Sequence, residues 1–225
     1  MPKLEMALFE SPRGIHPRLH SKNVDKILGY KIPKIEQKLL KNFRSYEQRA
    51  DRSNKKDHFK GTQTWIGLHP QILQTPYSDI LEIFKILEKQ HVKTIVDFGA
   101  AYGRVGLVLS CLSNKYNFIG YEILDERANE AHRVFDKYNL KKAKILTCNI
   151  LDNDFPVPQA DVYFIYDFSE VDDIRHIIYR IEQTYPENDY YIVARGERVN
   201  QALRYKYSVF HDFKKNDSKI YFRKA

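Results

Sequence analysis

The alternation of strand and helix patterns predicts an α/β fold built on a doubly wound, mostly parallel sheet of seven strands. After His91, short runs rich in β-branched residues recur, and most are separated by helical stretches. Two alternating strands with a polar turn between them close the chain, which predicts an antiparallel C-terminal hairpin. Before this region the sequence is basic and carries a long helical pattern, so we expect a basic, helical N-terminal extension.

Residues 1–30 contain three prolines and no sustained period, and we expect them to be irregular. From 34 to 52 the apolar positions have helical spacing and the opposite face is basic. Residues 53–74 are polar, and they show no sustained helical or strand period. A second helix is expected from 75 to 90, because Thr75 is a suitable N-cap and Pro76 suits the first helical position.

The strands of the expected sheet are each short and rich in β-branched or aromatic residues, and they cover 94–98, 117–122, 143–147, 161–166, 190–194, 207–213 and 219–223. Helices are expected at 103–112, which is mostly apolar, at 125–138 and at 171–185. The last two each carry one apolar stripe. The polar turn of the hairpin covers 214–218, and Asn216 and Asp217 favour it. The domain boundary is therefore placed between an extension at 1–74 and an α/β domain at 75–225.

Charge is concentrated at the start of the chain. Residues 1–60 hold 15 Lys and Arg against 7 Asp and Glu, whereas the other residues hold 22 of each. A basic segment can meet RNA, an acidic protein or a membrane surface, or it can be an ordinary solvated helix face. If the segment serves only a partner, deleting 1–60 should leave cofactor binding nearly unchanged.

Composition excludes several classes of protein. At 43 % hydrophobic residues the chain can bury a sizeable core, and no apolar run approaches the roughly 18 residues of a membrane span. No signal peptide is apparent. Two cysteines, Cys111 and Cys148, form no disulfide framework, which favours a reducing, cytoplasmic location. No histidine has zinc-ligand spacing with a cysteine, so we expect no metal site.

The segment VDFGAAYGRVG at 96–106 is the most specific feature of the sequence. Gly99 and Gly103 lie at an expected strand-to-helix turn, where glycine lets a ligand approach the backbone closely. Asp97 is at the carboxyl end of the strand, where open α/β sheets bind ligands. Glu122 ends the next strand and could accept both hydroxyls of an adenosine ribose. Together these residues predict a site for a nucleoside-containing cofactor.

Two common nucleotide motifs do not fit. The dinucleotide pattern G-x-G-x-x-G fails at Ala101 and Arg104, and the P-loop sequence G-K-[ST] is absent. The run Asp97, Gly99, Ala101, Gly103 resembles the acidic-x-Gly-x-Gly-x-Gly motif of class I S-adenosylmethionine-dependent methyltransferases. Ala101 departs from the motif, because it replaces the middle glycine. The resemblance covers about 75–225, and the antiparallel hairpin at the end of the sheet is also typical of that family.

The resemblance implies a set of cofactor contacts with S-adenosylmethionine. Asp97 would hold the methionine end, and the loop residues Gly99, Ala101 and Gly103 would line the adenosyl group. Glu122 would bind the ribose hydroxyls, with Ile123 against the adenine. Asn149, after the third strand, could meet the adenine amino edge, although an asparagine that only forms a turn is the alternative.

A narrower resemblance concerns protein lysine methyltransferases that lack a SET domain. It rests on LQTPYSDILEIFKIL, on the glycine segment and on GYEILDERANEAHRVF. In that group a threonine-containing loop before the first core helix reaches the cofactor, and this implies the same role for Thr75, Pro76 and Tyr77.

The acceptor side is expected after the fourth strand, at Tyr166, Asp167 and Phe168. Amino methyltransferases that act on nucleic-acid bases carry Asn/Asp-Pro-Pro-aromatic here, and this chain has no Pro-Pro. Asp167 could orient or deprotonate an amine, and the two aromatic residues could wall the methyl-transfer channel. The alternatives are a helix N-terminal acid before 171–185 for Asp167 and core packing for the aromatic residues.

These observations predict a methyltransferase that uses S-adenosylmethionine, yields S-adenosylhomocysteine and acts on a protein amine, with lysine favoured. RNA and small molecules are the alternative acceptors. A different class of function, a non-catalytic binding module that holds RNA or an acidic partner through residues 1–60, also stays open.

Overall fold

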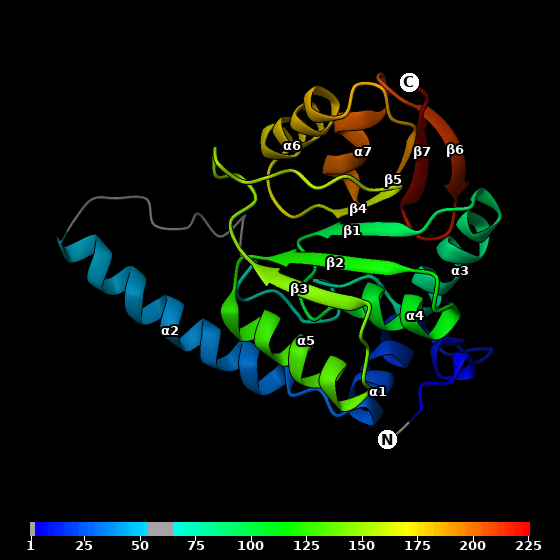
Figure 1. The fold of residues 1–225 in the computed structure, drawn as a ribbon. Helices are drawn as coiled ribbons and strands as arrows, with labels where there is room; N and C mark the ends of the chain where they lie inside the picture. Colours follow the sequence, from blue (N-terminus) through cyan, green and yellow to red (C-terminus); the bar gives the residue numbers. More distant parts are fainter. Residues whose placement is uncertain (1–2, 54–64) are drawn as a thin grey trace.

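The computed structural model describes residues 3–53 and 65–225, without the side chains of 43–53. A seven-stranded sheet in the order β3-β2-β1-β4-β5-β7-β6 forms its centre (Figure 1). The strands are β1 (Thr94–Phe98), β2 (Asn117–Glu122), β3 (Ala143–Thr147), β4 (Val162–Tyr166), β5 (Tyr190–Arg195), β6 (Ser208–Phe213) and β7 (Ser218–Arg223). Strands β1 to β5 pair in parallel, and β7 pairs antiparallel with both β5 and β6. The predicted doubly wound sheet with a C-terminal hairpin is confirmed.

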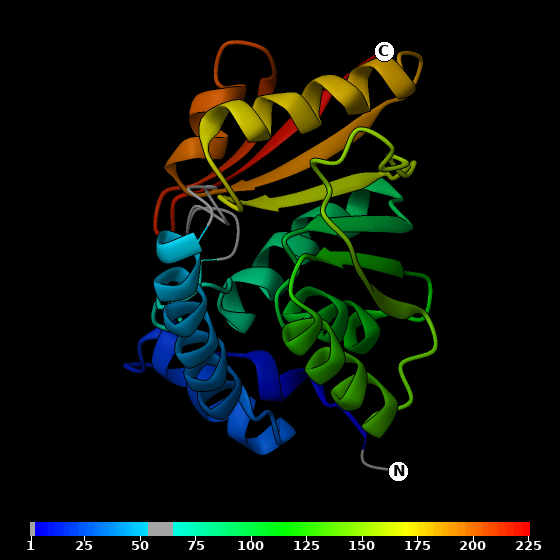
Figure 2. The same cartoon turned by 90° about the vertical axis from the view of Figure 1, so that its left-hand side faces the viewer.

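Helices cover both faces of the sheet (Figures 1 and 2). One face carries α1 (Pro17–Leu28), α3 (Tyr77–Leu87), α4 (Arg104–Leu112) and α5 (Asp125–Lys137), and their buried side chains share one core with the inner residues of β1 and β2. The other face carries α6 (Val171–Thr184) and α7 (Glu197–Leu203), which pack in a second core. Helix α2 (Ile32–Ser53) lies on the α5 side and ends beyond the carboxyl ends of the parallel strands (Figure 1).

Helix α1 lies in the segment that the sequence predicts to be irregular, so that prediction is wrong. Pro17 occupies its first turn, and Gly29, at φ 85°, ends it in the left-handed region. The buried stripe of α1 holds polar as well as apolar side chains: His20, Ser21, Val24, Asp25 and Leu28. Because three of these five positions are polar, the apolar periodicity that identifies a helix is missing. A short 3-10 helix, η1 (Met6–Phe9), precedes it.

Two further boundaries differ from expectation. Helix α3 begins at Tyr77 and not at Thr75, so Pro76 is the N-cap residue and Thr75 lies outside the helix. A second 3-10 turn, η2 (Glu88–Gln90), follows α3. Helix α7 begins just after Arg195 and Gly196, in a stretch for which the sequence analysis expects no helix. With seven residues it is too short for a clear period.

The basic N-terminal extension is not confirmed as a separate unit. Phe9, Val24, Leu28 and Ile32 are buried in the same core as α3 and α4. The boundary at residue 74 stays a prediction. The basic residues between 43 and 60 lie outside the described side chains. Within the described residues, the structure contains no helix with the length and apolar character of a membrane span.

Candidate functional site

The turn between β1 and α4 folds back on the end of β2. The backbone N–H groups of Gly99 and Ala100 both donate to the Tyr121 carbonyl, at 2.9 and 2.8 Å. The next N–H, of Ala101, donates to Glu122 Oε2 at 2.9 Å. Ala101 itself has φ 48°, in the left-handed region that glycine enters more easily. The alanine that departs from the motif is thus accommodated, and its N–H orients the acid at the end of β2.

Two glycines of this turn are needed for close packing as well as for positive φ. A Cβ on Gly99 (φ 82°) would lie 2.9 Å from Phe168 Cβ, and one on Gly103 (φ 74°) would lie 2.6 Å from Phe135 Cζ. Gly99 lines both cavities beside the turn, which are described below. Gly103 lines neither of the two cavities beside the turn, because it faces Phe135 and Ile145 beneath it. The structure therefore explains Gly103 by packing, and its contact with the cofactor stays a prediction.

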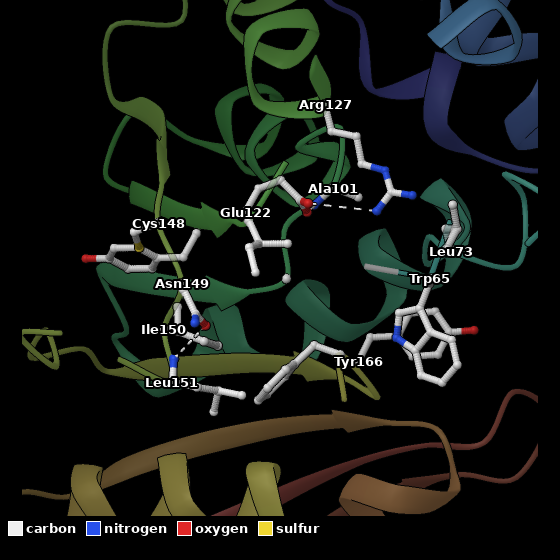
Figure 3. A pocket seen from close by; sticks show the side chains of 14 residues that line it. Trp65, Leu73, Ala101, Glu122, Arg127, Cys148, Asn149, Ile150, Leu151 and Tyr166 are labelled. Atoms are coloured by element: carbon white, nitrogen blue, oxygen red, sulfur yellow. Dashed lines mark hydrogen bonds and ion pairs between the residues drawn. The ribbon is translucent and has the colours of Figure 1, made fainter. Parts of the chain in front are cut away.

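A cavity opens over this turn at the carboxyl ends of β1, β2 and β4 (Figure 3). Seven of the predicted site residues line it: Gly99, Ala101, Glu122, Ile123, Asn149, Tyr166 and Phe168. Trp65 and Leu73 contribute from the segment before α3. The topology thus brings the glycine turn, the acid of β2 and the residues after β3 and β4 to one site.

The predicted adenine contact, Asn149, forms a local turn at the cavity wall. Its Oδ1 accepts from Leu151 N at 3.1 Å, and its Nδ2 donates to Asp152 Oδ1 at 2.8 Å. This is the turn-forming alternative. A role at the adenine edge stays a prediction, and it would share these hydrogen-bonding groups with the turn.

A smaller cavity adjoins the first and is lined by Asp97, Thr75 and Gln74 together with Gly99, Ala101 and Tyr166. The Gln74 amide and the Thr75 hydroxyl are buried, and no described residue provides either with a hydrogen-bond partner. Burial, and then the negative charge of Glu122, raise the pKa of Asp97 well above its usual range. Buried polar groups without partners are costly, so this arrangement favours a polar ligand.

A third cavity lies on the far side of Tyr166 and is walled by Trp65, Leu68, Ile72, Leu73, Tyr166, Asp167 and Arg198. Asp167 does not cap α6. Its two carboxylate oxygens accept from Val199 N at 2.9 Å and Arg198 N at 3.2 Å, at the start of α7. Burial raises the pKa of Asp167, against the effect of these amides. The helix-capping alternative is therefore observed at a different helix, and the catalytic role stays a prediction.

The aromatic neighbours of Asp167 are held differently from each other. Phe168 is buried in the core under Gly99 and reaches the cavity as part of its floor. Tyr166 is partly exposed, and its hydroxyl donates to the Ile72 carbonyl at 2.8 Å. Trp65 Nε1 donates to the Asp167 carbonyl at 2.9 Å. These two hydrogen bonds hold the segment before α3 over the ends of β4 and the glycine turn.

Buried charges tie the N-terminal helices to the site. Arg104, the first residue of α4, bonds to Asp25 of α1 through Nε and Nη2, and to Gln71 Oε1 at 2.9 Å. On the other side of the glycine turn, Arg127 of α5 pairs with Glu36 of α2 and lies 3.8 Å from Glu122. Burial raises the pKa of Glu122, and Arg127 opposes that rise.

Sequence reasoning missed Trp65, Leu73, Gln74, Arg127 and Glu36. One of them left a signal: Glu36 stands between Ile32 and Leu39 on the buried stripe of α2, where a charge is unusual. Trp65, Leu73 and Gln74 lie in a segment without helical or strand periodicity. Arg127 lies on α5, and its partner Glu36 comes from α2, far away in the sequence. In the part of the chain that the structure describes, no three His, Cys, Asp or Glu side chains are grouped to hold a metal ion.

Comparisons with known proteins agree with this geometry. No protein-family model and no curated protein matches the sequence. Among solved structures, a methyltransferase from Geobacter sulfurreducens aligns with a TM-score of 0.54 at 12 % identity, over 68 % of this chain and 81 % of its own. A candidate caffeoyl-CoA O-methyltransferase from Staphylococcus aureus gives 0.52 at 13 % identity, over 65 % and 83 %. The chain has the class I methyltransferase fold.

The residues at the site of this methyltransferase fold suit S-adenosylmethionine. Glu122 offers a carboxylate to two vicinal hydroxyls, since its two oxygens can accept about four hydrogen bonds. The Gln74 and Thr75 side chains have no hydrogen-bond partner among the described residues. Together with the Asp97 carboxyl they can meet an ammonium and a carboxylate, which are the charged groups of a methionine. Gly99 lines the cavity without a side chain, so an adenosyl group can approach the backbone of the turn closely. The donor set therefore fits the cofactor at each end.

Replacing Asp97 with asparagine is expected to stabilise the unliganded protein and weaken S-adenosylhomocysteine binding about tenfold. Because the folded-state pKa of Asp97 is raised, the folded protein holds its proton more tightly than the unfolded chain does. Stability from this group is therefore lost as pH rises from the ordinary pKa through the raised one. The neutral amide of the substituted side chain carries no such cost, and it also offers no negative charge to an ammonium.

Thermal unfolding of both proteins between pH 4 and pH 8 checks the stability effect. The melting temperature of Asp97→Asn should exceed that of the wild type near pH 8, and the gap should narrow toward pH 4. A variant that melts lower at every pH would show that the Asp97 carboxylate is stabilised in the fold and not poised for a ligand.

Proposed function

We propose that the chain is an S-adenosylmethionine-dependent methyltransferase whose acceptor is a protein amine, with lysine favoured. The cofactor assignment depends above all on the position of Glu122. This residue is the last of β2, and its buried carboxylate lies in the wall of the cavity over the glycine turn. Bound there, the cofactor supplies a methyl group activated by a sulfonium. The protein's part is to hold donor and acceptor in line, which can contribute most of the rate enhancement.

The cavity beside Asp167 supports an alkylamine acceptor. Most of its walls are apolar or aromatic, from Trp65, Leu68, Ile72, Leu73 and Tyr166, and these suit the methylene chain of a lysine. Asp167 places a carboxylate in the same wall. Although two backbone amides occupy part of it, a carboxylate has capacity for further hydrogen bonds, so Asp167 can orient an amine.

The amine must be neutral to attack. Burial raises the pKa of Asp167, which makes this carboxylate a better proton acceptor than an exposed aspartate. Tyr166 lines all three cavities, so it stands between the cofactor side and the acceptor side. Its hydroxyl is engaged with Ile72, and its ring is therefore fixed as a wall of the channel. We further propose a reducing, cytoplasmic setting, because Cys111 and Cys148 are both free.

RNA and small molecules remain the alternative acceptors, and a binding module is the alternative class. The binding module is disfavoured by the intact turn, in which Ala101 still donates its N–H to Glu122. RNA is favoured only by the basic composition of residues 1–60.

Incubation of the purified protein with methyl-labelled S-adenosylmethionine and a cell lysate tests the acceptor. We expect label that resists nuclease, is released by protease and is recovered as methyllysine after acid hydrolysis. The Asp167→Asn variant should transfer label at least about tenfold more slowly while binding S-adenosylhomocysteine within about threefold of the wild type. Label released by nuclease would overturn the protein acceptor, and cofactor binding without any transfer would favour the binding module.

A further inference from the structure

A further cavity, the α1 cavity, lies between α1, the start of α2 and the residues that follow Leu68. Its volume is about 230 Å³, and most of its wall is apolar, with side chains from Tyr30, Ile32, Pro33 and Pro70. An apolar cavity of about 150 Å³ is enough to hold a benzene molecule. The α1 cavity can therefore take one aromatic or branched aliphatic side chain.

Residues 68–72 separate the α1 cavity from the cavity beside Asp167, which is the acceptor cavity of the proposed function. Leu68 and Ile72 line the acceptor cavity, whereas residues 69–71 line the α1 cavity. Leu68 and Ile72 are 39 % and 42 % exposed, so the ridge between the two cavities offers apolar surface to a partner. Because five residues of extended chain span at most roughly 18 Å, one short polypeptide segment can reach both cavities.

The ridge is held in place from both sides. On the side of the α1 cavity, the Gln71 amide donates to Asp25 Oδ2 at 2.9 Å and accepts from Arg104 Nη2 at 2.9 Å. On the side of the acceptor cavity, the Tyr166 hydroxyl donates to the Ile72 carbonyl at 2.8 Å. A surface that is already ordered loses little conformational entropy when a partner binds.

Two lysines give the rim of the α1 cavity a positive charge. Lys22 and Lys26 line the cavity, are exposed, and lie one helical turn apart on the same face of α1. Among the side chains that the structure describes, neither lysine has an ion-pair partner. Asp25 is the one acid among the described lining residues, and its charge is matched by Arg104. The rim therefore complements acidic groups on a partner.

The walls of the α1 cavity favour a protein over RNA. An apolar wall suits a buried side chain and offers no hydrogen bond to a phosphate. Single-stranded RNA needs aromatic rings on which its bases can stack. Tyr30 is only 8 % exposed and its hydroxyl donates to the Tyr102 carbonyl, so its ring is not free for such stacking.

We propose that the α1 cavity is a docking pocket for the methyl-accepting protein: it holds an apolar side chain from an acidic segment close to the methylated lysine. Lys22 and Lys26 meet the carboxylates that flank this side chain. The inference rests on the proposed function, because it takes a protein as the acceptor. It gives the exposed face of α1 a part in substrate choice that is separate from cofactor binding.

The first test is fluorescence anisotropy with the fluorescein-labelled peptide Asp-Glu-Leu-Phe-Glu-Asp. Lys22→Glu/Lys26→Glu should bind it at least about tenfold more weakly than the wild type, because two attractive pairs become repulsive. Lys141→Glu/Lys142→Glu is the matched control: it makes the same change in net charge at two exposed lysines before β3, and it should bind like the wild type. The peptide Asp-Glu-Ser-Ser-Glu-Asp should also bind at least about tenfold more weakly, since it has no apolar side chain to bury.

The second test uses transfer of methyl label from S-adenosylmethionine to the proteins of a cell lysate. Lys22→Glu/Lys26→Glu should raise the half-saturating lysate concentration about tenfold and leave the maximal rate within about threefold of the wild type, because it weakens docking and not chemistry. Its affinity for S-adenosylhomocysteine in calorimetric titration should be unchanged.

The outcomes separate this inference from the function on which it rests. Wild-type protein that does not bind the acidic peptide, or double-variant protein that binds it equally well, would overturn the docking pocket. Label in protein with the same half-saturating concentration for both proteins would also overturn it and leave the proposed function intact. Displacement of the peptide by oligouridylate, with label released by nuclease, would assign the surface to RNA and contradict the proposal. No label in protein overturns the proposed function, and the assignment of the pocket to a substrate with it.

Discussion

Replacing Asp25 with alanine is expected to lower the free energy of unfolding by about 3–5 kcal/mol, because it strands a buried arginine. Asp25 is 5 % exposed on α1, and Arg104 at the start of α4 is 2 % exposed. The same carboxylate accepts from Gln71 Nε2 at 2.9 Å and from the Tyr77 hydroxyl at 3.0 Å. One substitution therefore leaves three buried donors with fewer acceptors.

Urea denaturation followed by circular dichroism measures this loss. Asp172→Ala is the matched control: its side chain is 91 % exposed and pairs with an exposed arginine, so its effect should stay within about 0.5 kcal/mol. Equal stability of Asp25→Ala and the control would mean that Arg104 is satisfied by its remaining contacts with Gln71 and the Thr75 carbonyl.

The Asp25 network also changes what an N-terminal deletion should do. Asp25 and Glu36 both lie within residues 1–60, and each holds a buried arginine beside the glycine turn. Deleting 1–60 is therefore expected to destabilise the fold and to impair cofactor binding, contrary to the expectation from charge distribution alone.

The second large effect is expected at Glu122. Glu122→Ala should weaken S-adenosylhomocysteine binding at least tenfold, because hydrogen bonds to a charged group contribute roughly 1.5–3 kcal/mol each. The substitution also removes the acceptor of the Ala101 N–H, so the glycine turn and the ribose both lose a hydrogen-bond partner. Glu126→Ala is the matched control in calorimetric titration, because it removes a partly exposed acid four residues further along the chain, at the start of α5. Equal affinities would place the ribose elsewhere.

The fold, and the meeting of most predicted site residues at one cavity, could be predicted because the signals for them are local. Strand β1 and the glycine turn are read from one short continuous segment, and Glu122 follows from the end of the next strand. Parallel strands place their carboxyl ends at one edge of the sheet, so this order in the sequence becomes proximity in space. Seven of the predicted residues meet at the cavity for that reason.

The remaining features depend on contacts between distant segments. Asp167 follows β4, yet it caps α7, a helix that begins about thirty residues later along the chain. Because α7 has only seven residues, its apolar periodicity is too brief to be recognised in the sequence. The buried face of helix α1 includes polar residues, so the sequence shows no apolar stripe there. The partners of its Asp25 are Arg104, Gln71 and Tyr77, which all lie far along the chain. Trp65 reaches the site from a segment without periodicity, through a hydrogen bond to a backbone carbonyl that no sequence pattern encodes.

The most direct test of the account is a calorimetric titration of the full-length wild-type protein with S-adenosylhomocysteine, repeated with 2′-deoxy-S-adenosylhomocysteine. We expect one saturable site for S-adenosylhomocysteine. The affinity for the deoxy compound should be about tenfold or more lower, since this compound lacks a ribose hydroxyl that donates to the Glu122 carboxylate. Absence of binding, or equal affinity for both compounds, would contradict the claim that this cavity holds the cofactor with its ribose on Glu122.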